Sequence, residues 1–325
     1  MNPNRRRRFL AAAGALLAAP LAARAQAWPA KPVRVVVGFP AGGLTDVLAR
    51  AYSEYLAQKL GQGFVVENRP GAGSMIACAE VARAAPDGYT FLFTISTAMN
   101  QNRVLYKKML YDPDTDFTYV SGFDAGHLPL AVGANVKAAN MREYVELAKT
   151  RRVTMGNYSP GSYPHMVAQQ LNKLYGTQIE PVPYKGEAPM WADLASGQID
   201  SALGSIAAML PFMASGKARP IAVPTTTRSP RLPEVPTYAE QGFKEPVFVI
   251  QGWIGMFGPA KLPRDIVERV SALIQEAADT PRIKTLNQNF GLRARPWTAK
   301  ELEDLNREVG PHWIALAREL GVTLD

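Results

Sequence analysis

The stretch KPVRVVVGFPAGGLTDVLAR, residues 31–50, runs from a strand through a glycine-rich loop into a helix. VRVVV is a β-branched run of the kind found in buried strands. From Val47 onward apolar residues recur at helical spacing, so Pro40–Thr45 joins the strand end to the helix start. Helix N-termini carry unpaired N–H groups and a partial positive charge. The loop is therefore predicted to hold an anion, either a nucleotide phosphate or a carboxylate.

Strand-like and helix-like segments alternate along the rest of the chain, which predicts an α/β fold with largely parallel sheets. The clearest helix is MREYVELAKT at 141–150, where Met141, Tyr144, Val145 and Ala148 share one face. VFVIQGWIGMFGPA at 247–260 is predicted to be a long apolar strand. Two helices are predicted at 263–279 and 298–320, with Pro263 and Thr298 near their starts.

Ligands of open α/β sheets bind beyond the carboxyl ends of the strands, in loops that lead into helices. The loops richest in small and polar residues are therefore the candidate site. They are Pro40–Asp46, Thr94–Asn102, Asn157–His165, Tyr184–Glu187 and Gly204–Ile206.

The first 27 residues resemble an export signal. Arg5–Arg8 precede the apolar run Phe9–Ala23, which is too short to span a bilayer, and Ala25–Ala27 is an A-x-A cleavage site. A twin-arginine signal and an ordinary secretory signal both fit. Cleavage would make Trp28 the first residue, and we expect a periplasmic location.

Charge and cysteine content narrow the class of protein. The formal net charge of +8 falls to +3 beyond residue 27, because the first 27 residues hold five arginines and no acid. No basic run interleaved with aromatics follows, so no nucleic-acid partner is expected. Cys78 is the only cysteine, so an intrachain disulfide is impossible. A core of two-domain size must hold without one.

The familiar catalytic and cofactor motifs are missing. No lysine follows the loop glycines, and Asp46 would repel a phosphate, which argues against nucleotide binding. GAGSMI at 71–76 lacks the third glycine of a dinucleotide fingerprint, and no G-x-S-x-G occurs. The three histidines lack metal-ligand spacing. We therefore predict no metal, no cofactor and no catalytic residue.

Two polar features each allow two interpretations. Asp46 lies in the first helical turn, where an acid is stabilised by the helix dipole, so it either caps the helix or contacts a ligand. Ser159 and Ser162 lie near His165 in sequence, which permits a nucleophile–base pair. Polar residues in such a loop more often cap a helix or bind a ligand. What remains is an exported α/β protein suited to binding an anionic solute.

Several motifs occur in one order that resembles the Bug family of periplasmic solute-binding proteins, receptors of tripartite tricarboxylate transporters. They are the opening stretch from Trp28, VVENRPGAGS (65–74), APDGYTFLF (85–93), LYKKMLYDPDTDFTYV (105–120), VPYKGEAP (182–189) and RSPRLPEVPTYAEQG (228–242). The resemblance implies a type II periplasmic-binding-protein fold, with two α/β lobes joined by crossing strands and a ligand cleft between them. Residues 28–124 plus 248–325 would form lobe 1, and residues 125–247 would form lobe 2.

The resemblance also implies where a ligand would be held. One carboxylate would lie on the backbone N–H groups of the loop Phe39, Pro40, Ala41, Gly42 and Gly43, with Thr45 and Asp46 beside it. The other implied contacts are Ser96 and Thr97 in lobe 1, and Tyr158, Ser159, Gly161, Ser162, Tyr163, His165, Tyr184, Gly204 and Ser205 in lobe 2.

Two departures from the family pattern affect these expectations. Tyr158 and Tyr163 stand where many relatives have small residues, so they would shrink the cleft or stack on a flat ligand. Relatives often carry an acidic or amide pair where Gly204 and Ser205 stand. Losing that acid is expected to leave room for a second carboxylate.

The expected function is a monomeric periplasmic receptor for a small carboxylate, either a dicarboxylate or an aromatic acid, which it delivers to a membrane permease. One alternative is an orphan ligand sensor without a dedicated permease. Another is a periplasmic hydrolase on the same scaffold, which would use Ser159, Ser162 and His165.

Overall fold

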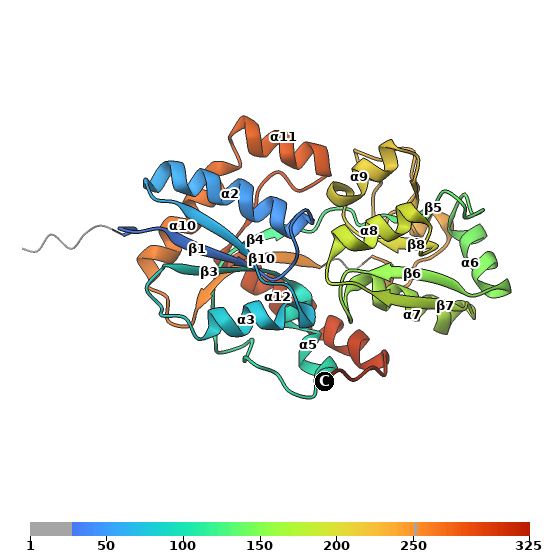
Figure 1. Ribbon diagram of the computed structural model, residues 1–325, viewed down its shortest axis with the longest axis horizontal. Coiled ribbons are helices and arrows are strands. Elements are labelled where there is room, and N and C mark those ends of the chain that lie inside the picture. The colour runs from blue at the N-terminus through green and yellow to red at the C-terminus, as the bar shows by residue number, and fades with distance from the viewer. Residues whose placement is uncertain (1–27, 250–251) are drawn as a thin grey trace, which may run out of the picture.

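The computed structural model describes residues 28–249 and 252–325, which form two α/β lobes, each built on one sheet (Figure 1). The signal segment predicted at 1–27 lies outside these residues, as do two positions of the strand expected at 247–260. We call the part built on the six-stranded sheet lobe 1 and the part built on the five-stranded sheet lobe 2. The exact boundaries proposed at 124/125 and 247/248 stay a prediction.

Lobe 1 contains the sheet of order β11-β4-β10-β3-β1-β2. Its strands are β1 (Val33–Val37), β2 (Phe64–Asn68), β3 (Thr90–Ile95), β4 (Phe117–Asp124), β10 (Trp253–Pro259) and β11 (Trp297–Thr298). Its helices are α2 (Leu44–Leu60), α3 (Met75–Ala82), α4 (Ser96–Met99), α5 (Asn102–Leu105), α10 (Arg264–Ala277), α11 (Pro281–Phe290) and α12 (Ala299–Glu319), with a 3-10 turn at Ala72–Ser74. The valines of β1 are buried, as the β-branched pattern of the opening stretch predicts, and β1 lies between β3 and the edge strand β2.

Lobe 2 contains the sheet of order β7-β6-β8-β5-β9. Its strands are β5 (Leu130–Gly133), β6 (Val153–Asn157), β7 (Ile179–Pro183), β8 (Ser201–Leu203) and β9 (Ala218–Ala222). Its helices are α6 (Met141–Thr150), α7 (Tyr163–Tyr175), α8 (Glu187–Ser196) and α9 (Ile206–Ala214). The predicted apolar face of α6 is confirmed, since its buried residues are Met141, Tyr144, Val145 and Ala148.

The expectation of largely parallel sheets is wrong. β1 is parallel to β2 and β3, and β6 to β7 and β8, but β10 is antiparallel to both β3 and β4. β5 is likewise antiparallel to β8 and β9. The reason is topological: the chain leaves lobe 1 after β4 and re-enters it at β10, and the returning strand inserts beside its exit strand in the opposite direction.

The strand expected over 247–260 is shorter than its apolar sequence suggests. β10 begins at Trp253, and Pro246–Phe248 forms a 3-10 turn. Pro246 occupies the first position of that turn, where its fixed φ and missing N–H favour a helical start over a ladder. The apolar residues Val247 and Phe248 are buried without being in a strand.

The two lobes pack against each other along α12 (Figure 1). Tyr163 at the start of α7 contacts Trp313 of α12 edge to face, with ring centroids 5.9 Å apart. At the end of α12, Glu319 accepts hydrogen bonds from Gln170 and Lys173 of α7. The last helix of lobe 1 therefore lies directly on lobe 2. None of the helices in the described residues is long and apolar enough to cross a membrane.

Candidate ligand-binding site

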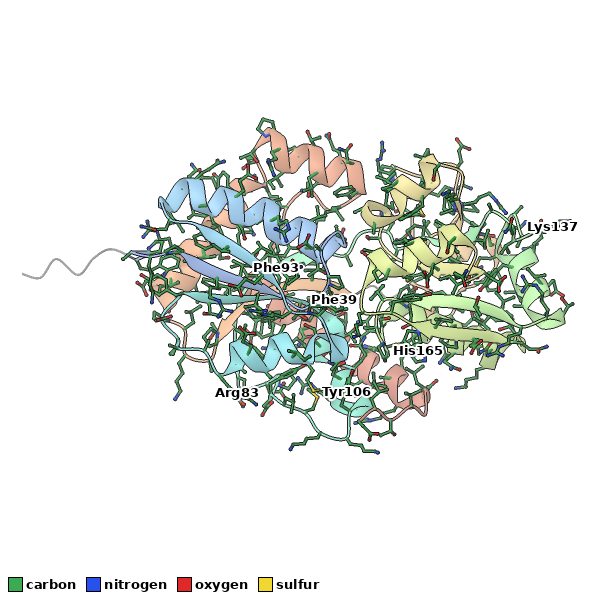
Figure 2. The ribbon with its side chains drawn as sticks, in the orientation of Figure 1. Phe39, Arg83, Phe93, Tyr106, Lys137 and His165 are labelled. Atoms are coloured by element: carbon green, nitrogen blue, oxygen red, sulfur yellow. The ribbon has the colours of Figure 1, made fainter. Side chains whose placement is uncertain are left out.

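A cavity lies where the two lobes meet, and each of the five candidate loops contributes to its wall. Figure 2 places Phe39 of lobe 1 on the side that faces lobe 2. The lining residues are Phe39, Pro40, Gly43, Leu44, Thr45, Ile95, Ser96, Thr97, Gln101, Ala125, Leu128, Tyr158, Tyr163, Glu187, Ser205, Gly252, Trp253, Ile254 and Trp313. The free space inside is about 50 Å³, room for a few water molecules.

The glycine-rich loop leads into α2 as expected, and the N–H group of the first helical residue is bonded to a carboxylate of the protein. Gly43 is the N-cap residue and supplies no side chain to cap the helix. The N–H of Leu44 instead donates to Oε2 of Glu187 at 3.0 Å. A carboxylate from lobe 2 therefore lies at the helix N-terminus of lobe 1, which is where dipole and N–H groups favour a negative charge.

Glu187 is fixed by its position in lobe 2. It is the first residue of α8 and follows Gly186, whose φ of +143° lies in the region that only glycine adopts readily. Its carboxylate also accepts hydrogen bonds from the N–H of Ser205 and, at 2.7 Å, from the hydroxyl of Ser205. Three donors from two lobes therefore hold this one carboxylate.

The loop at Gly204 and Ser205 has no acid of its own, but Glu187 places its carboxylate against it; room for a second carboxylate stays a prediction. Gly204 makes this possible: a Cβ at that position would lie 2.9 Å from Oε1 of Glu187. Gly43 faces the same carboxylate, with its notional Cβ 3.4 Å from Oε2. Because neither glycine has a side chain, both leave room for the carboxylate of Glu187, which lies elsewhere in the sequence.

Glu187 is the one ionisable acid among the described residues that line the cavity, and that lining holds no lysine, arginine or histidine. Its remaining wall is uncharged: apolar and aromatic residues stand beside the polar side chains of Thr45, Ser96, Thr97, Gln101 and Ser205. Burial raises the pKa values of Tyr158 and Tyr163, so both phenols keep their protons at neutral pH. The cavity is therefore electrostatically negative on the Glu187 side and neutral elsewhere.

Several residues of this lining each have a buried polar atom without a hydrogen-bond partner within the described part of the chain. These atoms are the hydroxyl of Tyr163, Nε1 of Trp253, Nε1 of Trp313 and Oε1 of Gln101. The first three are donors. Buried donors without partners are costly, so a site that holds three of them suits a ligand with acceptor oxygens.

Half of the predicted site residues line the cavity: Phe39, Pro40, Gly43, Thr45, Ser96, Thr97, Tyr158, Tyr163 and Ser205. The structure places Ala41, Gly42, Asp46, Ser159, Gly161, Ser162, His165, Tyr184 and Gly204 outside its lining. Their role in ligand binding stays a prediction.

Asp46 is engaged within its own lobe. Its carboxylate accepts hydrogen bonds from the N–H of Gly42, the guanidinium of Arg50 and the amide of Asn68. Burial alone would raise the pKa of Asp46, but the hydrogen bonds from Arg50, Asn68 and Gly42 outweigh it and lower that pKa. Asp46 therefore holds the loop that precedes α2, while α2 itself has no side-chain cap; a contact between Asp46 and a ligand stays a prediction.

The polar loop before α7 is folded onto itself. The hydroxyl of Ser162 donates to the carbonyl of Ser159, and Nδ1 of His165 accepts from the N–H of Gly161. His165 lies on the inner side of lobe 2 (Figure 2), and burial lowers its pKa, which keeps the ring neutral. Among the described residues, neither serine hydroxyl is bonded to His165.

A second hollow adjoins the cavity and shares Phe39 and Tyr158 with it. Ser159 and Tyr184 line this hollow, together with the exposed Lys185. The hydroxyl of Tyr184 donates to Asp193, so that ring is held in place from behind.

The predicted site residues lacked four polar or aromatic wall residues: Gln101, Glu187, Trp253 and Trp313. The first two lie within candidate loops, and the negative charge of Glu187 at a helix start was the available signal. Trp313 lies in the middle of α12, far from any candidate loop, and no local pattern could have assigned it to the site.

Comparison with known proteins agrees with this geometry. Residues 48–322 match the family described as tripartite tricarboxylate transporter family receptor. The chain belongs to this family. It is 30% identical to protein BugT of Bordetella pertussis over 319 residues, which cover 97% of this chain and 96% of that protein.

Two solved structures share the fold closely. The R. palustris protein Rpa4515, solved with adipate, has a TM-score of 0.86 and 30% identity, covering 91% of this chain and 99% of its own. MatC (Rpa3494) from Rhodopseudomonas palustris, solved with bound malate, has a TM-score of 0.81 and 28% identity, covering 89% of this chain and 100% of its own. The relatives are solute receptors of the periplasmic binding type.

Proposed function

We propose that this chain is a periplasmic receptor that binds a small organic acid between its lobes and delivers it to the membrane permease of a tripartite tricarboxylate transporter. The observation that carries the proposal is the set of donors on Tyr163, Trp253 and Trp313, three residues of the inter-lobe cavity wall, which have no hydrogen-bond partner among the described residues. Carboxylate oxygens are the strongest acceptors for such donors. The adipate and malate found in the two solved relatives support this class of ligand.

The same geometry favours a receptor over an enzyme. The neutral His165 accepts from a backbone N–H, and the hydroxyl of Ser162 is used within its own loop. A nucleophile would need that histidine as its base. We propose further that the receptor acts as a monomer and that residues 1–27 direct its export.

Thermal unfolding of the chain without residues 1–27 tests the proposal against aliphatic and aromatic mono- and dicarboxylates and amino acids. A ligand at 100 times its Kd adds about 2.7 kcal/mol, which raises the Tm by several degrees for a chain of this size. A hit identifies the ligand class. No shift with any acid, together with no organic acid in mass spectra of the denatured protein, would contradict the proposal.

A further inference from the structure

The carboxylate of Glu187 occupies the anion position at the start of α2. It takes the N–H of Leu44, the N–H of Ser205 and the hydroxyl of Ser205. A ligand carboxylate at this place would find these donors in use. The N–H group at the end of the glycine-rich loop thus binds a carboxylate of the protein itself, that of Glu187.

Glu187 belongs to lobe 2 and remains there when the lobes separate. Both of its bonds to Ser205 lie within lobe 2, and only the bond to Leu44 crosses to lobe 1. The bare backbone of Gly204 keeps the space for this carboxylate open from behind. A ligand that enters the open protein therefore meets a fixed negative charge on the wall of lobe 2.

In the described part of the cavity wall, no side chain would neutralise a second negative charge on the ligand. No cationic side chain lines the cavity among the described residues. Arg50 is paired with Asp46, and Lys185 lies exposed in the adjoining hollow. A ligand carboxylate within about 4–6 Å of Glu187 would be repelled by the like charge. A ligand ammonium at the same distance would be attracted, because opposite charges stabilise each other's charged forms.

We propose that Glu187 determines which charge the ligand carries at this end. The ligand presents an ammonium or other donor group to Glu187 and its single carboxylate to Tyr163, Trp253 and Trp313. The receptor therefore prefers aminocarboxylates over dicarboxylates of the same length. This inference rests on the proposed function, because it assigns the place of the ligand carboxylate in the same cavity.

Matched acid pairs test it by isothermal titration calorimetry: succinate against 4-aminobutanoate, and adipate against 6-aminohexanoate. The unaltered protein is expected to bind the amino member at least tenfold more tightly. In Glu187→Gln, which keeps the length of the side chain and one acceptor oxygen but removes the charge, that preference is expected to fall at least tenfold.

Glu146→Gln is the matched control, because Glu146 is an exposed acid of lobe 2 that pairs with Lys149 at the surface. This variant makes the same change in net charge and is expected to keep the preference. The Tm of each variant checks folding. If Glu187→Gln does not fold, the preference of the unaltered protein between the members of each pair decides the inference.

Tighter binding of the dicarboxylate member by the unaltered protein would overturn the role of Glu187 and leave the proposed function intact. An unchanged preference in a folded Glu187→Gln would do the same. Binding of none of these acids, nor of any acid in the thermal panel, would overturn the proposed function and this inference with it.

Discussion

At the scale of single residues, Asp46 shows how a buried acid shapes the glycine-rich loop. Its carboxylate accepts hydrogen bonds from three partners, Gly42, Arg50 and Asn68. Gly42 has a φ of +90°, so the N–H that it gives to Asp46 fixes a turn that few other residues would adopt. Asp46 thus fixes the conformation of the loop, and other residues of the same loop line the cavity.

We expect Asp46→Asn to destabilise the protein by about 1–2 kcal/mol at pH 7, because hydrogen bonds to the charged carboxylate are lost. The pKa of Asp46 is lowered in the folded state, so its contribution is present above the unfolded value of 3.8 and is lost as the pH falls through the folded value. Urea unfolding at pH 7 and near pH 3 should therefore show a difference that shrinks with acid. A difference that stays constant or grows in acid would contradict this account.

Sequence alone left the role of Asp46 open, and the structure shows what was missing. Its partner Asn68 lies 22 residues away at the end of β2, so the network forms only when β1 and β2 pair. Glu187 poses the same problem across 143 residues. Loop composition predicted where a site would form, but tertiary packing decides which polar side chains face it.

At the scale of elements, α12 begins with a capping box, for which Thr298 and, three residues later, Glu301 are the typical sequence pattern. The side chain of Thr298 accepts from the N–H of Glu301, and the carboxylate of Glu301 accepts from the N–H of Thr298. This fixes the start of the helix that carries Trp313 into the cavity wall.

Replacing Thr298 with alanine should lower the free energy of unfolding by about 1 kcal/mol, since one cap hydrogen bond is lost. Chemical denaturation measures it directly. Thr226→Ala, in an exposed loop, is the matched control and should change stability by less than about 0.5 kcal/mol. Equal effects of the two changes would mean that the cap contributes nothing of its own.

Two elements that the sequence analysis did not predict, β4 and α11, have weak apolar patterns for a physical reason. β4 contains Ser121 and Gly122 in its middle, which interrupts its apolar run. Gly122 is needed there, because a Cβ would lie 2.8 Å from Cδ1 of Leu302 in α12. α11 buries only Ile283 and Asn287, so its apolar face is too narrow to stand out in the sequence.

At the scale of the whole molecule, the arrangement of two lobes followed from a resemblance, whereas their contact surfaces did not. Gly161 of lobe 2 packs on Leu105 of lobe 1, and a Cβ on Gly161 would lie 1.9 Å from Cδ1 of Leu105. Its φ of +69° is also unfavourable for any other residue. This contact limits how closely the lobes approach.

Gly161→Ala should therefore weaken binding of whichever acid the panel identifies, since the packed arrangement of the lobes becomes harder to reach. We also expect a loss of about 1–3 kcal/mol in stability from the strained backbone and the overlap. Calorimetry of the single change and of Gly161→Ala combined with Leu105→Ala separates the two causes. The second change should restore affinity in part, and no restoration would assign the effect to backbone strain alone.

The indole rings of Trp253 and Trp313 form part of the cavity wall, and both buried Nε1 atoms lack a partner among the residues that the structure describes. Trp28, by contrast, donates to Gly88 on the far side of lobe 1. Indole emission depends on the polarity and hydrogen bonding around the ring. The protein thus contains its own optical reporter, whose colour and brightness should change as a solute arrives, with no dye attached.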